Sequence, residues 1–312
     1  MISRRLLRVK VLKELYGYAV SHNSLPAAEK ELALSIDKTY DQYKYLFLFL
    51  PMLQDYAQSR IDIGRQKFLP TDIEINPNTK FAENQVIQRI AENSDLRKYA
   101  ERNSVMLTEA SGVVKKMYAN IVEREYYKEY MENPTQSFAE DKQLLVDILV
   151  NEFEDLEDLE VLLEEQSIYW TDEPGFVVSA IIKTVKSMSA TKPFKLLEFF
   201  KNPEDEEFAS RLFRCSAVKF EEYSKLIDEY TPNWDVERIA FTDTLLLVAA
   251  IAELIEFPFI PVKVTMDEYI ELARFYSTSG SSTFINGVLD KAVHELTSKG
   301  MIEKRGAGLM EK

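Results

Sequence analysis

Five cations lie close together near the start of the chain. Arg4, Arg5, Arg8, Lys10 and Lys13 follow one another without an intervening acidic residue. Arginine and lysine side chains are the groups that proteins use to contact phosphates. Cations at the N-terminal end of a helix oppose the helix dipole, so a cluster there is unfavourable unless it serves a ligand. We therefore interpret the cluster as a site for an anionic ligand, with a solvated helix end as the alternative.

The sequence offers little that could perform covalent chemistry. Its two histidines, His22 and His294, are too few for a multi-histidine metal site. The single cysteine, Cys215, lies in a helical pattern, where we expect a buried and inert thiol. The segment 277–283 is rich in serine and threonine but lacks the Gly-x-x-x-x-Gly-Lys pattern of a phosphate-binding loop. We expect no enzymatic activity, no cofactor and no bound metal.

Composition is typical of a folded, helix-rich protein. The 312 residues are 46% hydrophobic and 29% charged, with 9 glycines and 11 prolines, which is enough apolar material for one large core or two modest ones. The single cysteine, the lack of a signal-peptide pattern and the shortness of the most apolar run, residues 45–53, favour a cytoplasmic protein without a membrane span. The net charge of -14 opposes nucleic acid binding except at a local basic surface.

Helical periodicity dominates the sequence, and strand alternation and internal repeats are not evident, so the predicted fold class is all-α. We predict one long helix over residues 35–67, capped by Ser35 and kinked at Pro51, followed by a loop at 69–78. The other predicted helices lie at about 3–20, 81–93, 104–132, 138–166, 174–189, 205–228, 234–256, 265–276 and 283–299.

The two helices nearest the C-terminus have recognisable starts. Thr265 and Glu268 have the spacing of a capping box, so we expect Thr265 to cap the first of these helices. Ser281 or Ser282 is the expected N-cap of the second. The serine- and threonine-rich residues between the two helices are predicted to form a loop.

Two separated blocks of the chain resemble the NusB family of bacterial transcription antitermination factors. The segments 261–274 and 284–291 are similar to the family signature Val-x-Ile-Asn-Glu-Ala-x-Glu-Leu-Ala-Lys and Phe-Val-Asn-Gly-Val-Leu-Asp-Lys. Trp234 and Arg238 belong to the same block, and the arginine-rich start of the chain resembles the opening helix of the family. Because the blocks occur in the family's order, the resemblance implies a NusB-like helical bundle.

The length of the chain implies an insertion, because NusB proteins are typically less than half as long. We predict a discontinuous NusB-like core of residues 1–35 and 203–300, a helical insertion of residues 36–202 and a C-terminal tail of residues 301–312. Aromatic residues between positions 40 and 56 would give the inserted subdomain a hydrophobic core of its own.

In NusB proteins the arginine-rich N-terminus and the Phe-Val-Asn-Gly region bind boxA-type single-stranded RNA. The resemblance therefore implies that Arg4, Arg5 and Arg8 contact phosphates. It also implies that Phe284 stacks on a base and that Asn286 makes a polar contact with a base. Basic surfaces and aromatic faces are what single-stranded RNA requires. The family's lysine before the phenylalanine is Thr283 here, so one phosphate contact is missing.

A neighbouring face of NusB proteins binds NusE, a small ribosomal protein, and Tyr16 and Asp243 match positions of that contact. The resemblance thus implies a factor that binds boxA-type RNA with NusE, joins RNA polymerase in an antitermination complex and supports ribosomal RNA transcription. The alternative is a protein-interaction adaptor that retains the NusE-binding face but binds RNA weakly. Self-association into a homodimer also stays open.

Overall fold

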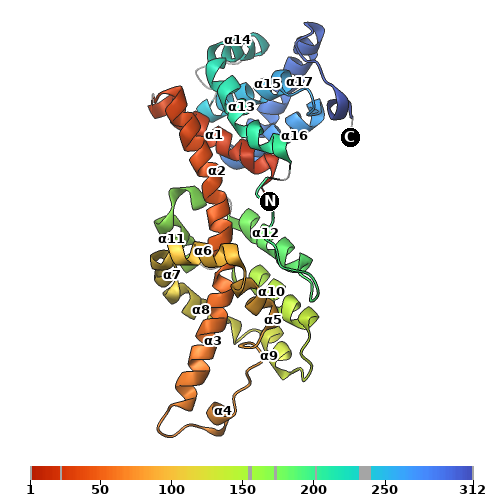
Figure 1. Ribbon diagram of the computed structural model, residues 1–312. Coiled ribbons are helices and arrows are strands. Elements are labelled where there is room, and N and C mark those ends of the chain that lie inside the picture. The colour runs from red at the N-terminus through yellow and green to blue at the C-terminus, as the bar shows by residue number, and fades with distance from the viewer. Residues whose placement is uncertain are drawn as a thin grey trace. The chain divides into compact units, whose positions relative to one another are not determined.

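The computed structural model describes residues 2–21, 23–153, 157–171, 174–200, 202–231 and 240–310. Across these ranges the regular structure is helical, with one isolated bridge between Ile2 and Phe200, so the predicted all-α class is confirmed (Figure 1). His22, Trp234 and Arg238 lie outside the described residues. Within the described ranges, every helix is too short or too polar to cross a membrane.

The chain divides into two compact units. Unit 1 comprises residues 1–36 and 199–312, and unit 2 comprises residues 37–198. The boundary between residues 36 and 37 falls inside α2 (Leu25–Phe47), so this helix contributes its first part to unit 1 and its second part to unit 2.

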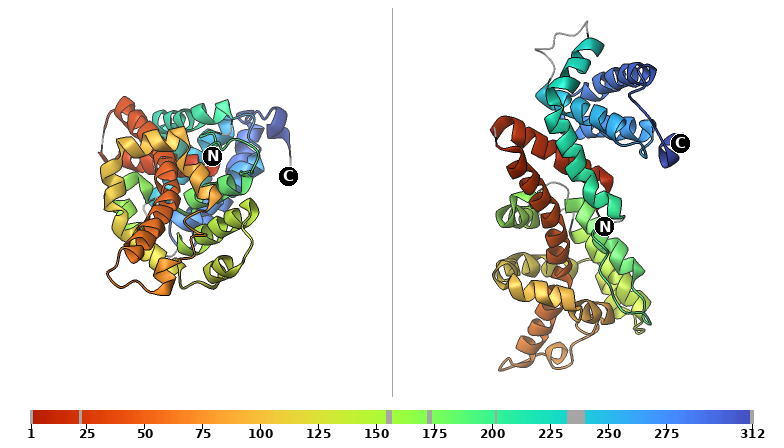
Figure 2. Two further views of the ribbon diagram at one scale, coloured as in Figure 1. Left: turned by 60° about the horizontal axis from the view of Figure 1, so that its bottom comes forward. Right: turned by 45° about the horizontal axis from the view of Figure 1, so that its top comes forward.

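Unit 1 is organised around one apolar helix, α15 (Phe241–Glu256), whose residues 245–252 are all apolar and all buried. A helix that is apolar on every side must be packed on every side. Its neighbours are α1 (Arg4–Ser21), α13 (Pro203–Val218), α14 (Phe220–Tyr230), α16 (Val262–Tyr276) and α17 (Ser281–Ser298). Figures 1 and 2 show α16 and α17 side by side. A short 3-10 helix, η3 (Gly306–Leu309), follows in the C-terminal tail.

The two predicted helix starts near the C-terminus are wrong. Helix α16 begins at Val262 without a side-chain cap, so Thr265 lies inside the helix and forms no capping box with Glu268. The N-cap of α17 is Gly280, with a φ of 99°, rather than a serine. Glycine is favoured at such a left-handed position because it lacks a Cβ. The polar side chains expected to cap these helices bind buried carboxylates instead, as described below.

Unit 2 has an aromatic core, with Tyr43, Tyr45, Phe47, Phe49 and Trp170 almost fully buried. The helices of this unit after α2 are α3 (Phe49–Arg65), α4 (Asp72–Ile75), α5 (Gln85–Ala91), α6 (Ser94–Arg102), α7 (Ser104–Glu109), α8 (Ser111–Ile121), α9 (Glu125–Glu132), α10 (Phe138–Glu152), α11 (Glu157–Gln166), η1 (Ile168–Trp170) and α12 (Pro174–Ser187). Helix α3 packs against α5 and α8, and α10 packs against α12.

The long helix predicted over residues 35–67 is interrupted. Helix α2 ends at Phe47 and α3 begins at Phe49, with a turn at Leu48. Pro51 has no amide hydrogen to donate to the carbonyl of Phe47, and in a continuous helix its ring would clash with that carbonyl. The break therefore lies one helical turn before the proline. Ser35 is not a cap: it lies within α2, and its Oγ donates to the Leu32 carbonyl oxygen at 2.8 Å.

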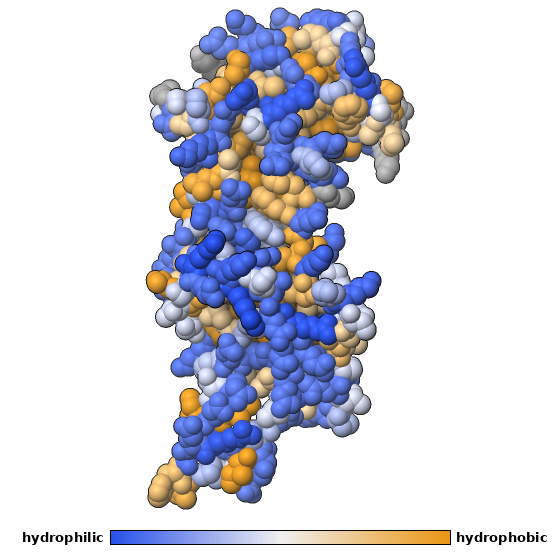
Figure 3. All heavy atoms as spheres, in the orientation of Figure 1, coloured by the Kyte–Doolittle hydropathy of each residue, from blue (hydrophilic) through white to orange (hydrophobic). Residues whose placement is uncertain are grey.

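Shorter elements also depart from the prediction. Residues 104–132 form α7, α8 and α9 rather than a single helix, and α6 was not predicted as a separate element. The expected loop at 69–78 contains α4, which a capping box of Thr71 and Glu74 starts. The end of unit 2 that carries α4 exposes apolar side chains (Figure 3), among them Phe68, which is 97% exposed.

Candidate nucleic-acid interface

Arg8 forms a buried ion pair within unit 1. Its side chain is 3% exposed, and its Nε and Nη2 donate to the two carboxylate oxygens of Glu253 on α15, at 2.8 and 2.7 Å. Burial alone would lower the pKa of Arg8, but Glu253, with smaller contributions from Tyr269 and Glu268, raises the pKa above its ordinary value. A bidentate pair of this kind fixes both distance and orientation. Arg8 therefore joins α1 to the central helix of the unit.

Glu253 also accepts hydrogen bonds from α16. Thr265 Oγ1 donates to its Oε1 at 2.8 Å, and the Tyr269 hydroxyl donates to its Oε2 at 3.4 Å. Burial, and then Glu253, raise the pKa of Tyr269 well above its ordinary value, so the hydroxyl keeps its proton. The buried carboxylate is thus satisfied by α1 and α16 together, which fixes the two helices with respect to α15.

Arg4 and Arg5 lie on the first turn of α1 and are accessible. Arg4 Nε donates to Asp205 Oδ1 at 2.7 Å, and Arg5 Nε donates to Glu268 Oε2 at 3.2 Å. Their side chains are 34% and 47% exposed. An exposed pair such as Arg5–Glu268 contributes about 0–1 kcal/mol and is screened by salt, so a phosphate can compete for Arg5. Asp205 is buried and keeps its bond to Arg4, which leaves the other N–H donors of that guanidinium for a phosphate. The burial of Arg8 argues against the phosphate contact predicted for that residue.

A groove of about 660 Å³ lies between α16, α17 and the C-terminal tail. Its apolar lining includes Met266 and Ile270 of α16 and Leu309 of the tail. Its polar lining consists of Lys263, Asp267, Asn286 and Lys304. Of these, Asn286 was predicted from the sequence, and it is exposed. The groove thus combines cations, an amide and an apolar surface next to the family-like segments.

Neither lysine of the groove was predicted from the sequence. Lys263 is exposed and lies four positions before Asp267, so the two share one face of α16, and this helical spacing could have identified it. Lys304 lies in the tail, where neighbouring residues gave no comparable signal. Burial lowers the pKa of Lys304 to about 8, and its Nζ donates to the Phe257 carbonyl oxygen at 3.1 Å.

The tail is held in place against the loop between α15 and α16. The Arg305 amide donates to the Pro258 carbonyl oxygen at 2.9 Å. Gly308 lies so close to the same residue that an added Cβ would be 2.0 Å from the Pro258 carbonyl oxygen. A glycine is therefore required at this approach, and the tail forms a fixed wall of the groove.

Phe284 is half-buried in the first turn of α17, two positions before Asn286. Ile285, between them, is fully buried. Phe284 does not belong to the lining of the groove, whereas Asn286 does. Asn286, the predicted amide contact, therefore lines the groove. Phe284, the predicted stacking residue, lies outside the lining and two positions earlier in α17.

The residues predicted to contact a protein partner have unlike environments. Tyr16 is 49% exposed, and its ring centre lies 5.8 Å from that of Phe241, which is also exposed. Asp243 is buried and accepts hydrogen bonds from Ser277 Oγ at 2.5 Å and Ser281 Oγ at 2.8 Å. Tyr16 and Phe241 therefore present the accessible aromatic surface, while Asp243 fixes the α16–α17 loop to the start of α15. Phe241, two positions from Asp243, was not predicted.

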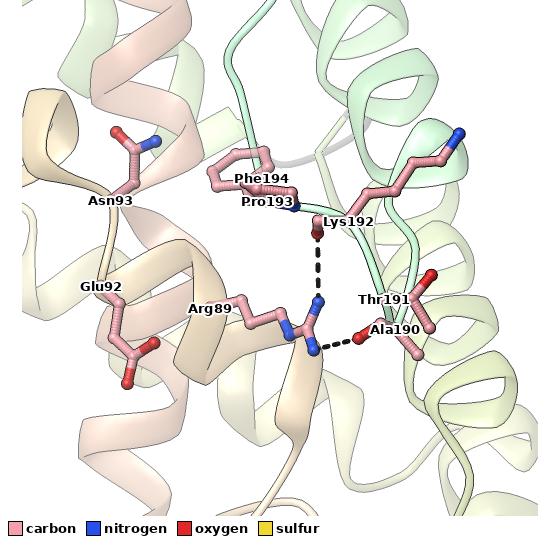
Figure 4. Close-up of a pocket in the computed structure, with 8 residues that line it drawn as sticks. All are labelled: Arg89, Glu92, Asn93, Ala190, Thr191, Lys192, Pro193 and Phe194. Carbon is pink, nitrogen blue, oxygen red and sulfur yellow. Dashed lines mark hydrogen bonds between the residues drawn. The ribbon is translucent and has the colours of Figure 1, made fainter.

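Unit 2 has a separate hollow of about 430 Å³ between Arg89 and the segment 189–194 (Figure 4). The Arg89 guanidinium donates to the carbonyl oxygens of Ser189, Ala190 and Lys192. These bonds hold the segment to α5, so we interpret Arg89 as a structural clamp. In the part of the chain that the structure describes, no group of three or more His, Cys, Asp and Glu side chains could hold a metal ion.

Comparison with known proteins identifies the family. The NusB family model matches residues 176–294. The transcription antitermination protein NusB of Salinibacter ruber is 41% identical over 109 residues, which are 35% of this chain and 68% of that protein. The chain belongs to the NusB family. Proteins of this family carry the name transcription antitermination protein, which agrees with the resemblance found in the sequence.

Two further NusB relatives give the same result. The protein of Chloroherpeton thalassium is 35% identical over 105 residues, which are 34% of this chain. The protein of Koribacter versatilis is 40% identical over 96 residues, which are 31% of this chain. The matched segments cover 50% and 66% of those proteins, so the chain spans about half to two thirds of these NusB sequences. No solved structure matches the chain.

The NusB match and the two compact units have different boundaries. Of the matched range, residues 176–198 belong to unit 2 and residues 199–294 belong to unit 1. Helix α1 lies outside the matched range, yet the ion pair of Arg8 and Glu253 connects it to a helix within that range. The N-terminal helix is therefore a structural part of unit 1.

Proposed function

We propose that this NusB-family chain is a transcription antitermination factor that binds boxA-type single-stranded RNA together with NusE. In this role it joins RNA polymerase in an antitermination complex and supports ribosomal RNA transcription. The observation that carries the proposal is the groove between α16, α17 and the tail, which brings Lys263, Lys304 and Asn286 together beside an apolar lining. Single-stranded RNA is held by basic grooves and by aromatic faces on which bases stack. The groove supplies the cations, and Phe284 of α17 is the proposed aromatic face.

Each residue of the site has a distinct part in the proposal. Arg4, Arg5 and Lys263 contact phosphates, and Lys263 compensates for the family lysine that is Thr283 here. Asn286 binds a base edge, and Phe284 offers a stacking surface at the start of the same helix. Arg8 acts as a positioning residue, because its ion pair with Glu253 holds α1, with Arg4 and Arg5 on it, against unit 1.

The proposed NusE surface is formed by Tyr16 and Phe241. Both aromatic rings are exposed, and aromatic side chains are enriched at protein interfaces because they bury a large area with few rotatable bonds. Asp243 contributes indirectly, through its hydrogen bonds to Ser277 and Ser281. A homodimer that used the same surface would compete with NusE.

Fluorescence anisotropy of a labelled boxA-type RNA, with and without NusE and over a range of salt concentrations, tests the proposal. We expect salt-sensitive binding that NusE strengthens. Replacing one phosphate-binding residue, by Arg5→Ala or Lys263→Ala, should reduce the slope of log affinity against log salt by about 0.7. Arg274→Ala is the matched control, because Arg274 is a 60% exposed cation on α16 that lies outside the groove.

The same titration can contradict the proposal. If NusE docks on the chain but labelled RNA does not bind, the RNA-binding role is wrong and the adaptor role replaces it. Equal losses from Lys263→Ala and Arg274→Ala would mean that RNA is attracted by charge alone, without use of the groove.

A further inference from the structure

A second cavity of unit 1, of about 500 Å³, lies between the start of α13 and the loop that joins α15 to α16. Aromatic rings form much of its lining: Phe208 of α13, and Phe257 and Phe259 of the loop. The ring centres of Phe208 and Phe257 are 5.1 Å apart, and these two side chains are buried. Phe259 is 62% exposed. Phe259 is therefore the ring of this cavity whose surface a flat ligand can cover, while the two buried rings form the base of the cavity.

Two guanidinium groups belong to the same lining. The Arg4 guanidinium carbon lies 5.4 Å from the centre of the Phe208 ring, and that of Arg211 lies 5.0 Å from the centre of the Phe257 ring. Arg4 donates to Asp205, and Arg211 donates to the Glu256 carbonyl oxygen at 2.6 Å. A guanidinium carries five N–H donors, so these bonds leave donors on both residues for a ligand.

Two carboxylates complete the polar lining. Glu204 and Glu207 lie three positions apart in the first turns of α13, so they share one face of the helix. Both are exposed, and neither forms an ion pair with a residue that the structure describes. The cavity thus combines flat aromatic surface with hydrogen-bond donors from arginine and acceptors from glutamate.

We propose that this cavity binds a guanine base of the RNA, which makes the inference dependent on the proposed function. Guanine has two acceptors, O6 and N7, on one edge, and arginine binds this pair with two hydrogen bonds. Its N1–H and N2–H groups form a pair of donors that one carboxylate can accept. Adenine, cytosine and uracil each lack at least one of these two pairs. Aromatic residues supply stacking for the faces of the base.

The position of Arg4 connects the cavity to the proposed RNA site. Arg4 belongs both to the cavity lining and to the accessible cation pair at the start of α1. A strand whose phosphates lie on Arg4 and Arg5 therefore has the cavity within reach of a neighbouring base. An apolar peptide side chain would cover Phe259 but would form no hydrogen bonds with the remaining arginine donors or with the Glu204 and Glu207 carboxylates.

Binding of mononucleotides to the full chain tests the cavity without the RNA. Guanosine 5′-monophosphate should bind about tenfold more tightly than the adenosine, cytidine and uridine monophosphates, in titrations followed by NMR. Glu207→Gln should abolish this preference, and Phe259→Ala, which removes the exposed stacking surface, should weaken the binding of all four mononucleotides. The matched controls are Phe275→Ala, which removes a 72% exposed phenylalanine outside the cavity, and Glu206→Gln, which neutralises an exposed glutamate next to Glu207.

A second experiment uses RNA in which inosine replaces each guanosine in turn, because inosine lacks the N2 amine. At one position the substitution should weaken binding to the unmodified chain about tenfold, and it should have no further effect on the Glu207→Gln variant. Circular dichroism melting of each variant checks that the fold is retained, as the exposure of Phe259 and Glu207 leads us to expect.

The outcomes separate the two proposals. If guanosine monophosphate binds with the expected preference but boxA-type RNA does not bind, the proposed function fails and the cavity remains a guanine site. If RNA binds but inosine, Phe259→Ala and Glu207→Gln change nothing, the guanine site is overturned and the RNA function remains. Loss of NusE affinity in Phe259→Ala, with RNA affinity unchanged, also overturns it, because the cavity then serves a protein.

Discussion

The two units stabilise their buried polar groups in different ways. In unit 1 a buried cation pairs with a buried anion, Arg8 with Glu253, although the two residues are 245 positions apart in sequence. In unit 2 the buried Glu152 carboxylate pairs with a cation that is half exposed, Arg124, and the buried Lys80 and Asn84 side chains bind backbone atoms. Lys80 Nζ donates to the carbonyl oxygens of Tyr130 and Asn133, and Asn84 Oδ1 accepts from the first amides of α5.

This difference determines how each unit responds to the loss of one side chain. When one member of a buried ion pair is removed, the other remains as an uncompensated charge in a medium that solvates it poorly. When a side chain that binds the backbone is removed, the loss is limited to the hydrogen bonds and to the groups left without a partner. Unit 1 should therefore be the more sensitive to a single polar substitution, and its sensitivity should be greatest at α1.

The largest effect should follow from Arg8→Ala, which leaves Glu253 buried without its cation. We expect the free energy of unfolding to fall by about 3–5 kcal/mol, measured by urea denaturation with circular dichroism. The double variant Arg8→Met with Glu253→Met should recover most of this loss, because apolar replacement of a whole buried pair is often neutral. A loss below about 1 kcal/mol in Arg8→Ala would mean that the pair is not an anchor.

A smaller effect is expected from Asn84→Ala in unit 2. Asn84 is fully buried, its Oδ1 accepts from the amides of Val86 and Ile87, and its Nδ2 donates to the Asp141 carbonyl oxygen. Loss of a helix cap and of a buried donor should cost about 2 kcal/mol. Asn93→Ala is the control, because Asn93 caps α6 in the same way but is only half-buried, so it should cost about 1 kcal/mol. If the two variants lost the same free energy of unfolding, the burial of Asn84 would not explain its cost.

The elements that could be predicted are those with a local signal. The apolar run of α15 and the helices that carry the family-like segments were predicted from residues close together in the chain. The arrangement of the ion pair was not, because the pattern of α1 does not show whether Arg8 faces solvent or a distant carboxylate. The same applies to Thr265, whose spacing to Glu268 suggests a cap although its hydroxyl binds Glu253.

In the candidate site, too, some residues could be predicted from the sequence and others could not. Arg5 and Asn286 occupy accessible positions, as their resemblance to family positions implies. Asp243 matches a family position as well, but its carboxylate is buried by contacts with Ser277 and Ser281, which are distant in sequence. Lys304 reaches the groove only because the tail folds back on the α15–α16 loop, and such long-range packing leaves no periodic trace in the sequence.

The smallest effect should be a pH dependence that Glu14 gives to unit 1. Burial, and then the nearby Glu31, raise the pKa of Glu14 on α1 from its ordinary value of 4.5 to about 7. The folded chain therefore binds this proton more tightly than the unfolded chain. The resulting stability is fully present below pH 4.5 and is lost as the pH rises through about 7.

Glu14→Gln should remove this dependence, because glutamine has no proton to lose. Thermal melts between pH 4 and 9 should show the variant gaining stability relative to the unmodified chain as the pH rises through about 7, with the difference constant above about pH 8. Glu31→Gln should give a part of the gain, since burial is the larger cause and remains. If the difference in melting temperature between the variant and the unmodified chain does not change with pH, water solvates Glu14 in the folded chain and the attachment of α1 does not depend on this carboxyl group.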